Sequence, residues 1–520
     1  MIKNWKYKLA AQLGHNPVKI YNYVRNNIDF VPTYGSIQGA NHCLMTKQCN
    51  DMDTASLLIA LLRVSNIPAR YVYGTIEVPI EKVMNWVGGF TDAKSALNFI
   101  SSGGTPAIGL VSGGKIVAAR MEHTWVEGYV DYIPSRGAIH KQGDTWIPMD
   151  ASFKQFTFTS GIDLQAAVPF DAQAFADQLQ STAAIDPITG SVTNVNTALI
   201  QTTLTSLQTS LQAAFPNATV DQLVGKKTIT AQGFPFLPVT LPFKKVIIGS
   251  RMSGLTDSVR HKITFEVAAN AFFGADLMFT ASLPELAGKR ISLRYSPATE
   301  ADKTTLLSFK DATSVRAYLV KMKPELLVEG VVKAIGGSLT MGTDETFSMT
   351  FSAPGGSERI DNLITAGSYT AIGLDLGVVS EAVVQKRIDN LNVTKGRFAA
   401  GDLAAISLDD VMGESLTVQA LGYFFELDLF TKIIERQQGV VAARLPSEGL
   451  VAQGVRVSTL FGTPVSASAD GPSIDVDRDI QAVLAKDGDA AKVIQYFQAS
   501  GPLGSGLEHG IFEQKKSVLI

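Results

Sequence analysis

The stretch Asp51–Val64 constrains the fold of this chain most strongly. Its apolar residues recur at helical spacing, and extra leucines widen the apolar face until little polar surface remains. The pattern ends at Ser65-Asn66 with Pro68 just beyond, and Arg70–Ile76 then alternates as a strand does. We therefore predict a central, buried helix that is followed directly by a strand.

Other segments complete a predicted α+β domain over residues 1–158. Asn16-Pro17 is typical of a helix start, because asparagine caps the helix and proline fits its first turn. His123–Val130 alternates as a strand, and Thr145–Asp150 predicts another strand after an intervening turn.

Patterns in the rest of the chain predict helical, mainly β and mixed segments. Helical periodicity around a turn predicts a helical hairpin over 159–224, and repeated alternation predicts a mainly β, sandwich-like region over 225–375. A helical segment over 376–440 and a mixed segment over 441–520 follow. We expect a multidomain α+β protein.

Charge and hydropathy exclude some functions. Lys and Arg together number 45 and Asp and Glu 48, so the net charge of −3 provides no global field for nucleic acid. No window approaches the roughly 18 apolar residues of a membrane span, and the N-terminus does not read as a cleavable signal. We expect a cytoplasmic location by default, or export as part of a larger assembly.

The only cysteines are Cys43 and Cys49, which excludes a disulfide framework. One short bridge remains an alternative to a thiol that is kept for chemistry, and Cys43 is otherwise expected to be a small buried residue. These cysteines together with His42 and His123 have donor atoms for zinc, but their spacing is not that of a zinc site. We expect no metal and no cofactor.

Three residues of the first domain could form a nucleophilic triad. Cys49 lies just before the central helix, His123 opens one strand and Asp150 ends another. A thiol nucleophile needs a base to take its proton and a third group to orient that base, and a helix N-terminus lowers the pKa of a thiol. Glu127 shares the strand face of His123, where it could tune the imidazole or meet solvent, and His261 reads as a core residue.

The same residues carry a resemblance to a known superfamily. Cys49–Arg63 and Asn66–Gly74 resemble the nucleophile helix and the following strand of transglutaminase-like domains. Glu122–Glu127 and Trp146–Ser152 are similar to the histidine and aspartate strands of that superfamily. The resemblance covers roughly residues 20–155 and implies a papain-like mechanism in which cysteine attacks an acyl carbon, histidine carries the proton and aspartate orients the histidine.

The sequence departs from the superfamily pattern at the nucleophile. When the helix is registered on the family motif, the nucleophile position falls on Asp51, and Cys49 stands two residues earlier. Two positions correspond to roughly 200° of helix or up to about 7 Å of extended chain. Cys49 would therefore reach His123 only if the preceding loop were distorted.

Two later sequence segments resemble regions that follow the N-terminal transglutaminase-like domains of large YD-repeat (Rhs-type) surface or toxin proteins. These segments are Leu286–Leu293 and Leu507–Gln514. The resemblance implies that further segments of a larger polypeptide or a toxin complex are partners.

These observations support three hypotheses about function. The first is an acyl-transfer enzyme, a peptidase or amidase that acts on protein or peptide through Cys49, His123 and Asp150. The alternative is a catalytically impaired module with a binding or structural role in a larger protein. The third is self-processing of an adjoining segment.

Overall fold

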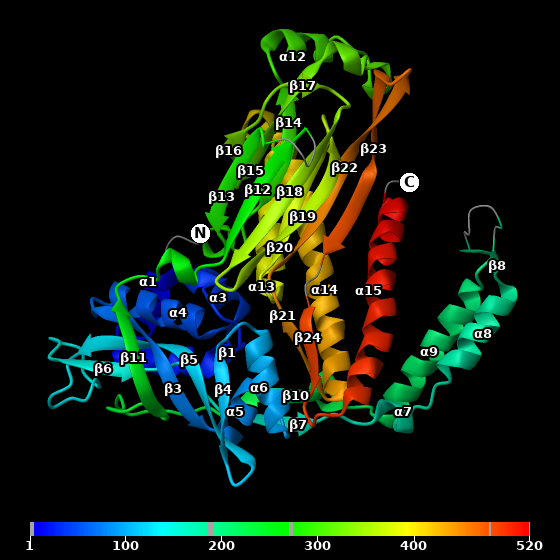
Figure 1. Ribbon diagram of the computed structural model, residues 1–520. Coiled ribbons are helices and arrows are strands. Elements are labelled where there is room, and N and C mark those ends of the chain that lie inside the picture. The colour runs from blue at the N-terminus through cyan, green and yellow to red at the C-terminus, as the bar shows by residue number, and fades with distance from the viewer. Residues whose placement is uncertain (1–4, 186, 188–191, 270–273, 478–479, 519–520) are drawn as a thin grey trace.

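The computed structural model describes residues 5–185, 187, 192–269, 274–477 and 480–518. It is a mixed α+β structure that contains several sheets, as predicted, and its N-terminal part forms the lower left of Figure 1. The helices of this part are α1 (Trp5–Gln12), α2 (Pro17–Asn27), α3 (Gly39–Thr46), α4 (Asp51–Val64), α5 (Ile80–Val87) and α6 (Ala93–Ser102).

Helix α4 has the predicted bounds and lies in the centre of this part. The side chain of Asn50 caps it by accepting a hydrogen bond from the Asp53 backbone N–H at 2.9 Å. Most residues of α4 are buried, and the helix packs against α1, α2 and α3 on one side and the sheet on the other. The all-round apolar pattern is therefore explained by neighbours on every side.

The N-terminal sheet has the strand order β11-β3-β5-β4, and β6 pairs with the end of β5. Its strands are β3 (Ala69–Pro79), β4 (Ala107–Ser112), β5 (Lys115–Val130), β6 (Thr145–Met149) and β11 (Lys244–Met252). The predicted strands are present, but β11 comes from the region that was predicted as a separate β segment. In addition, β1 (Asp29–Phe30) and β2 (Gln48–Cys49) form a short parallel pair just before α4.

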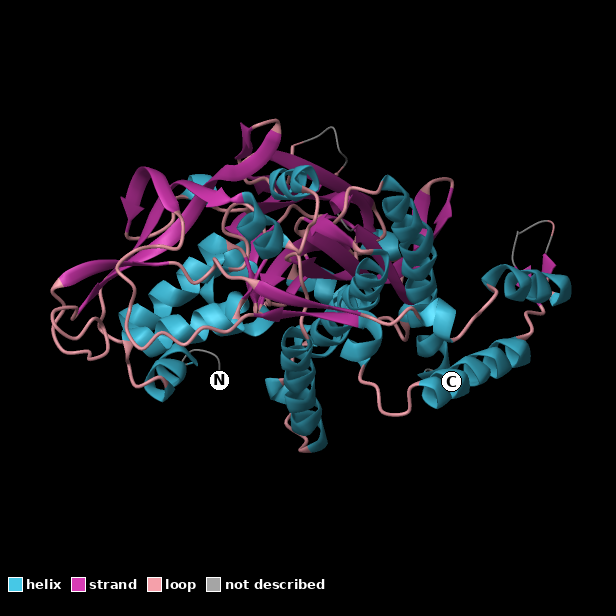
Figure 2. Ribbon diagram, turned by 90° about the horizontal axis from the view of Figure 1, so that it is seen from below, coloured by secondary structure: helices cyan, strands magenta, loops and turns pink. Residues whose placement is uncertain are grey.

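The region predicted as a helical hairpin contains two longer helices, α8 and α9, with the β8–β9 pair between them, and the hairpin itself stays a prediction. Helices α8 and α9 carry no buried residue, and Figures 1 and 2 show them extending away from the rest of the molecule. The elements of this region are β7 (Phe156–Ser160), α7 (Leu164–Ala167), α8 (Ala172–Thr182), β8 (Ala184–Ile185), β9 (Val192–Thr193), α9 (Thr197–Ala214), α10 (Val220–Val224) and β10 (Gly225–Ile229).

Two larger sheets pack face to face as a sandwich. One has the order β13-β12-β18-β19 and the other β16-β15-β14-β20-β22-β23, with β17 pairing to β15. Apolar residues of both sheets, such as Phe265 and Leu293, share one core. The strands are β12 (Lys262–Ala268), β13 (Leu277–Ser282), β14 (Ile291–Pro297), β15 (Lys321–Val328), β16 (Val331–Ile335), β17 (Leu339–Thr340), β18 (Asp344–Ala353), β19 (Gly356–Thr365), β20 (Tyr369–Asp375), β22 (Ser447–Leu460) and β23 (Thr463–Asp477).

The segment predicted as mixed over 441–520 contributes to this sandwich, because β22 pairs with β20 over seven residues. The remaining elements are α11 (Leu283–Leu286), α12 (Glu300–Leu307), α13 (Glu381–Ala399), α14 (Glu414–Gln438), β21 (Val440–Arg444), β24 (Ile480–Ala485) and α15 (Ala490–Val518). Strand pairs such as β3–β11 and β20–β22 join different predicted segments. The division of the chain into five segments stays a prediction.

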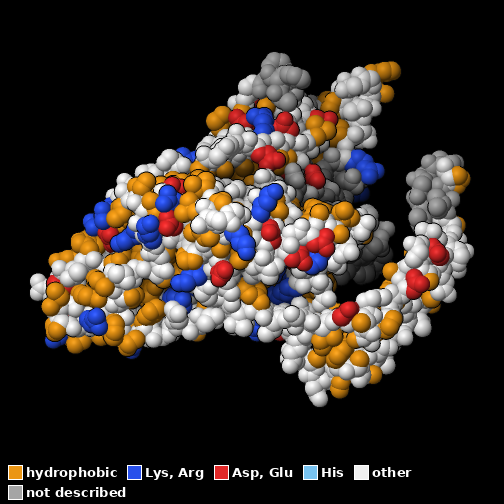
Figure 3. All heavy atoms as spheres, turned by 60° about the horizontal axis from the view of Figure 1, so that its bottom comes forward, with side chains coloured by type: hydrophobic (Ala, Val, Ile, Leu, Met, Phe, Trp, Pro, Cys, Tyr) orange, Lys and Arg blue, Asp and Glu red, His pale blue; other side chains and the backbone are white. Residues whose placement is uncertain are grey.

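Basic and acidic side chains are interspersed on the face drawn in Figure 3, as the near-balance of charges in the sequence suggests. Within the described residues, no helix has both the length and the apolar character needed to cross a bilayer.

Candidate functional site

The candidate site lies where the N-terminus of α4 meets β5 and the end of β6. Asp51 is the first residue of α4, His123 lies within β5, and Asp150 directly follows β6. In the sheet, β3 and β6 both pair with β5, and this pairing brings Asp150 back to His123 across 27 residues of sequence.

The imidazole of His123 lies between two carboxylates. Its Nε2 atom is 2.9 Å from Asp150 Oδ2, and its Nδ1 atom is 3.1 Å from Asp51 Oδ2. The predicted histidine–aspartate pair is therefore formed. The second ring nitrogen faces Asp51, the residue to which the family register assigned the nucleophile position.

Backbone groups hold both carboxylates in place. Asp51 accepts hydrogen bonds from the backbone N–H groups of Thr124 at 2.7 Å and Met52 at 2.8 Å. Asp150 accepts from the Ser152 backbone N–H at 2.8 Å and from its hydroxyl at 2.6 Å. Neither side chain depends on His123 alone for its orientation.

The two carboxylates determine the protonation of His123. Burial by itself would lower the pKa of the imidazole, but the charge of Asp150 and the hydrogen bonds to Asp150 and Asp51 raise it to about 10. Burial also opposes ionisation of Asp150, yet the charge of His123 and the hydrogen bonds from His123 and Ser152 hold the pKa of that carboxyl below its usual value. At neutral pH the imidazole is therefore a cation that donates from both nitrogens.

Aromatic side chains enclose this cluster. The rings of Trp86 and Phe243 meet the imidazole edge-on, with centroids 5.4 and 5.6 Å away. Phe243 comes from the segment just before β11, and it also packs against Phe153. As a result, His123 is only 1% exposed.

Cys49 does not lie beside His123, which corrects the expectation of a cysteine–histidine pair. Its sulfur is bonded to that of Cys43 in a disulfide that joins α3 to β2. Residue 49 also pairs regularly with Phe30 in the β1–β2 ladder, so the chain before α4 has not been distorted to bring the sulfur to the imidazole. Of the two alternatives for the cysteines, the structure forms the short bridge.

Glu127 neither contacts His123 nor stands free in solvent. Its carboxylate forms ion pairs with Arg70 at 2.7 Å and with Arg251 of β11 at 2.9 Å. His261 is a buried residue whose Nε2 lies 2.8 Å from the Tyr34 carbonyl oxygen, and burial lowers its pKa. The core interpretation of His261 is confirmed.

Asp53 positions the start of α4 in a way that the sequence did not reveal. Its buried carboxylate accepts hydrogen bonds from the backbone N–H groups of residues 37, 38 and 39 and from the Ser36 hydroxyl, at 2.7 to 3.0 Å. These bonds connect the loop before α3 to the first turn of α4. Acidic residues are common in the first turn of any helix, so their presence gave no specific signal.

A metal site is not found here: across the described ranges, no three His, Cys, Asp or Glu side chains are grouped to hold a metal ion. The cysteines are joined to each other, and both nitrogens of His123 face carboxylates.

Comparison with known proteins identifies a family for the N-terminal part of the chain. The family model for the transglutaminase-like superfamily matches residues 8–151, which contain α4, β5 and β6. None of the curated proteins and none of the solved structures compared with the chain matches it significantly. No match supports the resemblance of later segments to YD-repeat proteins. Residues 8–151 form a domain of the transglutaminase-like superfamily.

Proposed function

We propose that this chain is a catalytically inactive transglutaminase-like module with a structural or binding role. The observation that carries the proposal is the contact between His123 and Asp51, at the place where the superfamily's mechanism needs a thiol. A carboxylate is a much weaker nucleophile toward an acyl carbon than a thiolate is.

The protonation of His123 supports the proposal. A general base must be unprotonated when it accepts a proton, and efficient bases have a pKa near the working pH. With a pKa of about 10, the imidazole of His123 is protonated near neutral pH. The aromatic side chains of Trp86 and Phe243 also leave little room for a substrate to approach it.

The cluster of Asp51, His123 and Asp150 can stabilise the fold. This role would explain why a domain without the thiol keeps His123 and Asp150. An imidazolium beside Asp51 carries the same charges as an imidazolium beside a thiolate. Replacing the nucleophile by aspartate therefore preserves an ion pair between α4 and β5, and Asp150 extends that pair to β6.

The alternative is an acyl-transfer enzyme that uses Cys49, and it requires two changes in this structure. Its disulfide with Cys43 would have to be reduced, and β2 would have to separate from β1 before the sulfur could approach His123. Self-processing through the same thiol has the same requirements.

Alkylation and turnover test the proposal together. Folded protein without reductant should take up no iodoacetamide, release no product from peptide or amide substrates, and stay intact on prolonged incubation. A variant that combines Asp51→Cys with Cys43→Ala and Cys49→Ala places a thiol beside His123, and it should be alkylated more slowly once His123→Gln is added. Product release by the wild-type protein that disappears in Cys49→Ala would overturn the proposal.

We also keep as a proposal that the module belongs to a larger YD-repeat-type polypeptide. It rests on two sequence phrases, and packing accounts for the first: Leu286, Ile291 and Leu293 fill the sandwich core. Immunoblotting of native material tests this proposal, which expects a polypeptide much larger than 55.6 kDa. A native chain of about the size described here would contradict it.

A further inference from the structure

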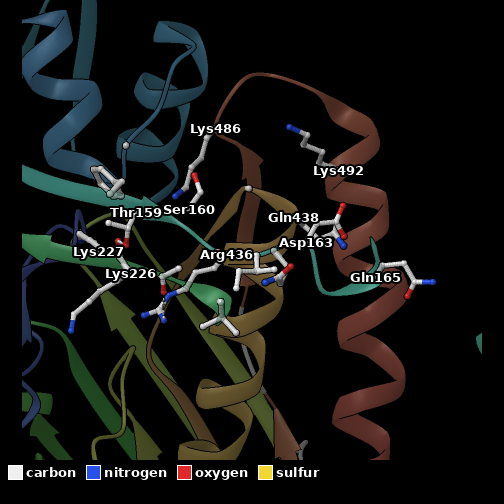
Figure 4. Close-up of a pocket in the computed structure, with 18 residues that line it drawn as sticks. Thr159, Ser160, Asp163, Gln165, Lys226, Lys227, Arg436, Gln438, Lys486 and Lys492 are labelled. Atoms are coloured by element: carbon white, nitrogen blue, oxygen red, sulfur yellow. Dashed lines mark hydrogen bonds between the residues drawn. The ribbon is translucent and has the colours of Figure 1, made fainter. Parts of the chain in front are cut away.

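A cavity of about 670 Å³ lies away from the His123 cluster, between the β7–β10 pair, the last turn of α14 and the turn that leads into α15. Figure 4 shows the labelled side chains gathered around this hollow from four separate segments of the chain. Its size falls within the range of pockets that hold small molecules.

The lining of this cavity is strongly basic although the whole chain is almost neutral. Asp163 is the only carboxylate among the described lining residues, whereas the cationic side chains number five: Lys226, Lys227, Arg436, Lys486 and Lys492. Such a local excess of one charge sign in a concave site attracts ions of the opposite sign.

Three of these cations have a carboxylate partner of their own. The pairs are Lys226 with Asp221, Lys227 with Asp29, and Lys492 with Asp487. The corresponding partner is absent for the other two cations: within the described ranges, neither Lys486 nor Arg436 forms an ion pair with a carboxylate. The cavity therefore holds two cations that form no ion pair with a carboxylate of the described residues, although the charge of Glu435 acts on Lys486 and the charge of Arg436 acts on Asp221.

These two cations contact an aromatic ring and a backbone carbonyl oxygen instead of a carboxylate. The ammonium of Lys486 lies 5.2 Å from the centroid of the Phe158 ring, and Arg436 Nη1 donates to the Gly225 carbonyl oxygen at 3.2 Å. Burial lowers the pKa of Lys486, and the nearby charges of Lys227 and Arg436 lower it further, against the opposite effect of the Glu435 carboxylate. An anion bound among them would relieve this repulsion.

The end of helix α14 explains only part of the arrangement. Cations in the last turn of a helix interact favourably with its macrodipole, and Arg436 is in that position. Lys486, however, follows β24 and is brought to the cavity from another part of the chain. Its placement among other cations needs a different reason.

We propose that this cavity binds a phosphate group, either as the free ion or as the ester of a small organic molecule. Arg436 would contribute the planar guanidinium that suits phosphate oxygens, Lys486 a point charge, and Ser160 in the same lining a hydroxyl donor. Phosphate carries up to two negative charges near neutral pH. This number matches the two cations that lack a carboxylate in an ion pair. The site is separate from His123, so the inference does not depend on the proposed function.

Titration calorimetry of the full chain tests the proposal with inorganic phosphate, glycerol 3-phosphate and neutral glycerol. We expect saturable binding of the phosphates, none of glycerol, and weaker binding at high salt. Lys486→Ala and Arg436→Ala should each weaken binding about tenfold, the size expected for the loss of one charged hydrogen bond. Tighter binding of glycerol 3-phosphate than of inorganic phosphate would identify the organic ester as the ligand.

Three controls keep the test decisive. Lys226→Ala removes a lining cation that is already paired and should change the affinity much less, while Lys303→Ala on α12 should not change it. Lys486→Arg keeps the charge and should retain phosphate binding. Circular dichroism checks that each variant is folded. The proposal is wrong if no phosphate binds saturably, if Lys486→Ala and Lys303→Ala bind equally well, or if citrate binds more tightly than both phosphates.

Discussion

The Nδ1 atom of His123 lies 3.1 Å from Oδ2 of Asp51, the first residue of α4. Asp150 holds the other ring nitrogen at 2.9 Å, so the imidazole joins α4 to the end of β6 through β5. The imidazole is thereby held between two carboxylates, and the cluster links three elements of the domain.

Removing the Asp51 carboxylate should destabilise the fold. Asp51→Ala leaves a buried imidazolium with one partner and deprives the Thr124 N–H of its acceptor, which should lower the free energy of unfolding by about 3–5 kcal/mol. Asp51→Asn keeps the shape and an acceptor oxygen and should cost less. Urea denaturation followed by tryptophan fluorescence measures both, with the exposed Glu300→Ala as control. Unchanged stability of Asp51→Ala would show that the pair has no structural role.

The stability that His123 contributes should depend on pH in a defined direction. Folding raises its pKa from 6.5 to about 10, so the contribution is complete below pH 6.5 and is lost as the pH rises towards 10. The lowered pKa of Asp150 affects stability at acidic pH. Its contribution is present above pH 3.8 and is lost as the pH falls below that value.

Thermal unfolding of the wild type and of His123→Gln between pH 5 and 10 checks this direction. The difference in Tm should be largest near pH 5 to 6 and should shrink towards pH 10. A difference that grows with rising pH would mean that the imidazole is buried in its neutral form.

The disulfide should stabilise the chain modestly. Cys43 and Cys49 are six residues apart, and closing so short a loop restricts the unfolded chain by about 2 kcal/mol. We expect Cys43→Ala combined with Cys49→Ala to lower the free energy of unfolding by about this amount. Thiol titration of unfolded, unreduced protein should find no free thiol, and two after reduction. Two free thiols before reduction would contradict the bridge.

Local signals in the sequence were enough to predict α4 and its neighbours. The apolar pattern, the capping residue Asn50 and the break near Pro68 lie within or beside the helix itself, so its bounds could be read directly. The pairing of His123 with Asp150 came from the family resemblance, because spacing alone does not show which residues of distant strands meet.

Long-range contacts account for what the sequence did not reveal. Phe243 covers His123 from a segment 120 residues later, and β22 joins β20 in a sheet from the other side of two long helices. Such pairings depend on how whole elements pack, and periodicity within a segment carries no information about them. The family register pointed to Asp51, and the structure shows that its carboxylate contacts the imidazole.

The most direct measurement is an NMR titration of protein labelled with nitrogen-15 in its six histidines, in the wild type and in Asp51→Asn. The ring nitrogens of His123, assigned by their loss in His123→Gln, should both be protonated at pH 7 and should titrate with a midpoint near 10. In Asp51→Asn the midpoint should fall. A wild-type midpoint at or below 6.5, unchanged in Asp51→Asn, would contradict a carboxylate in the place of the thiol.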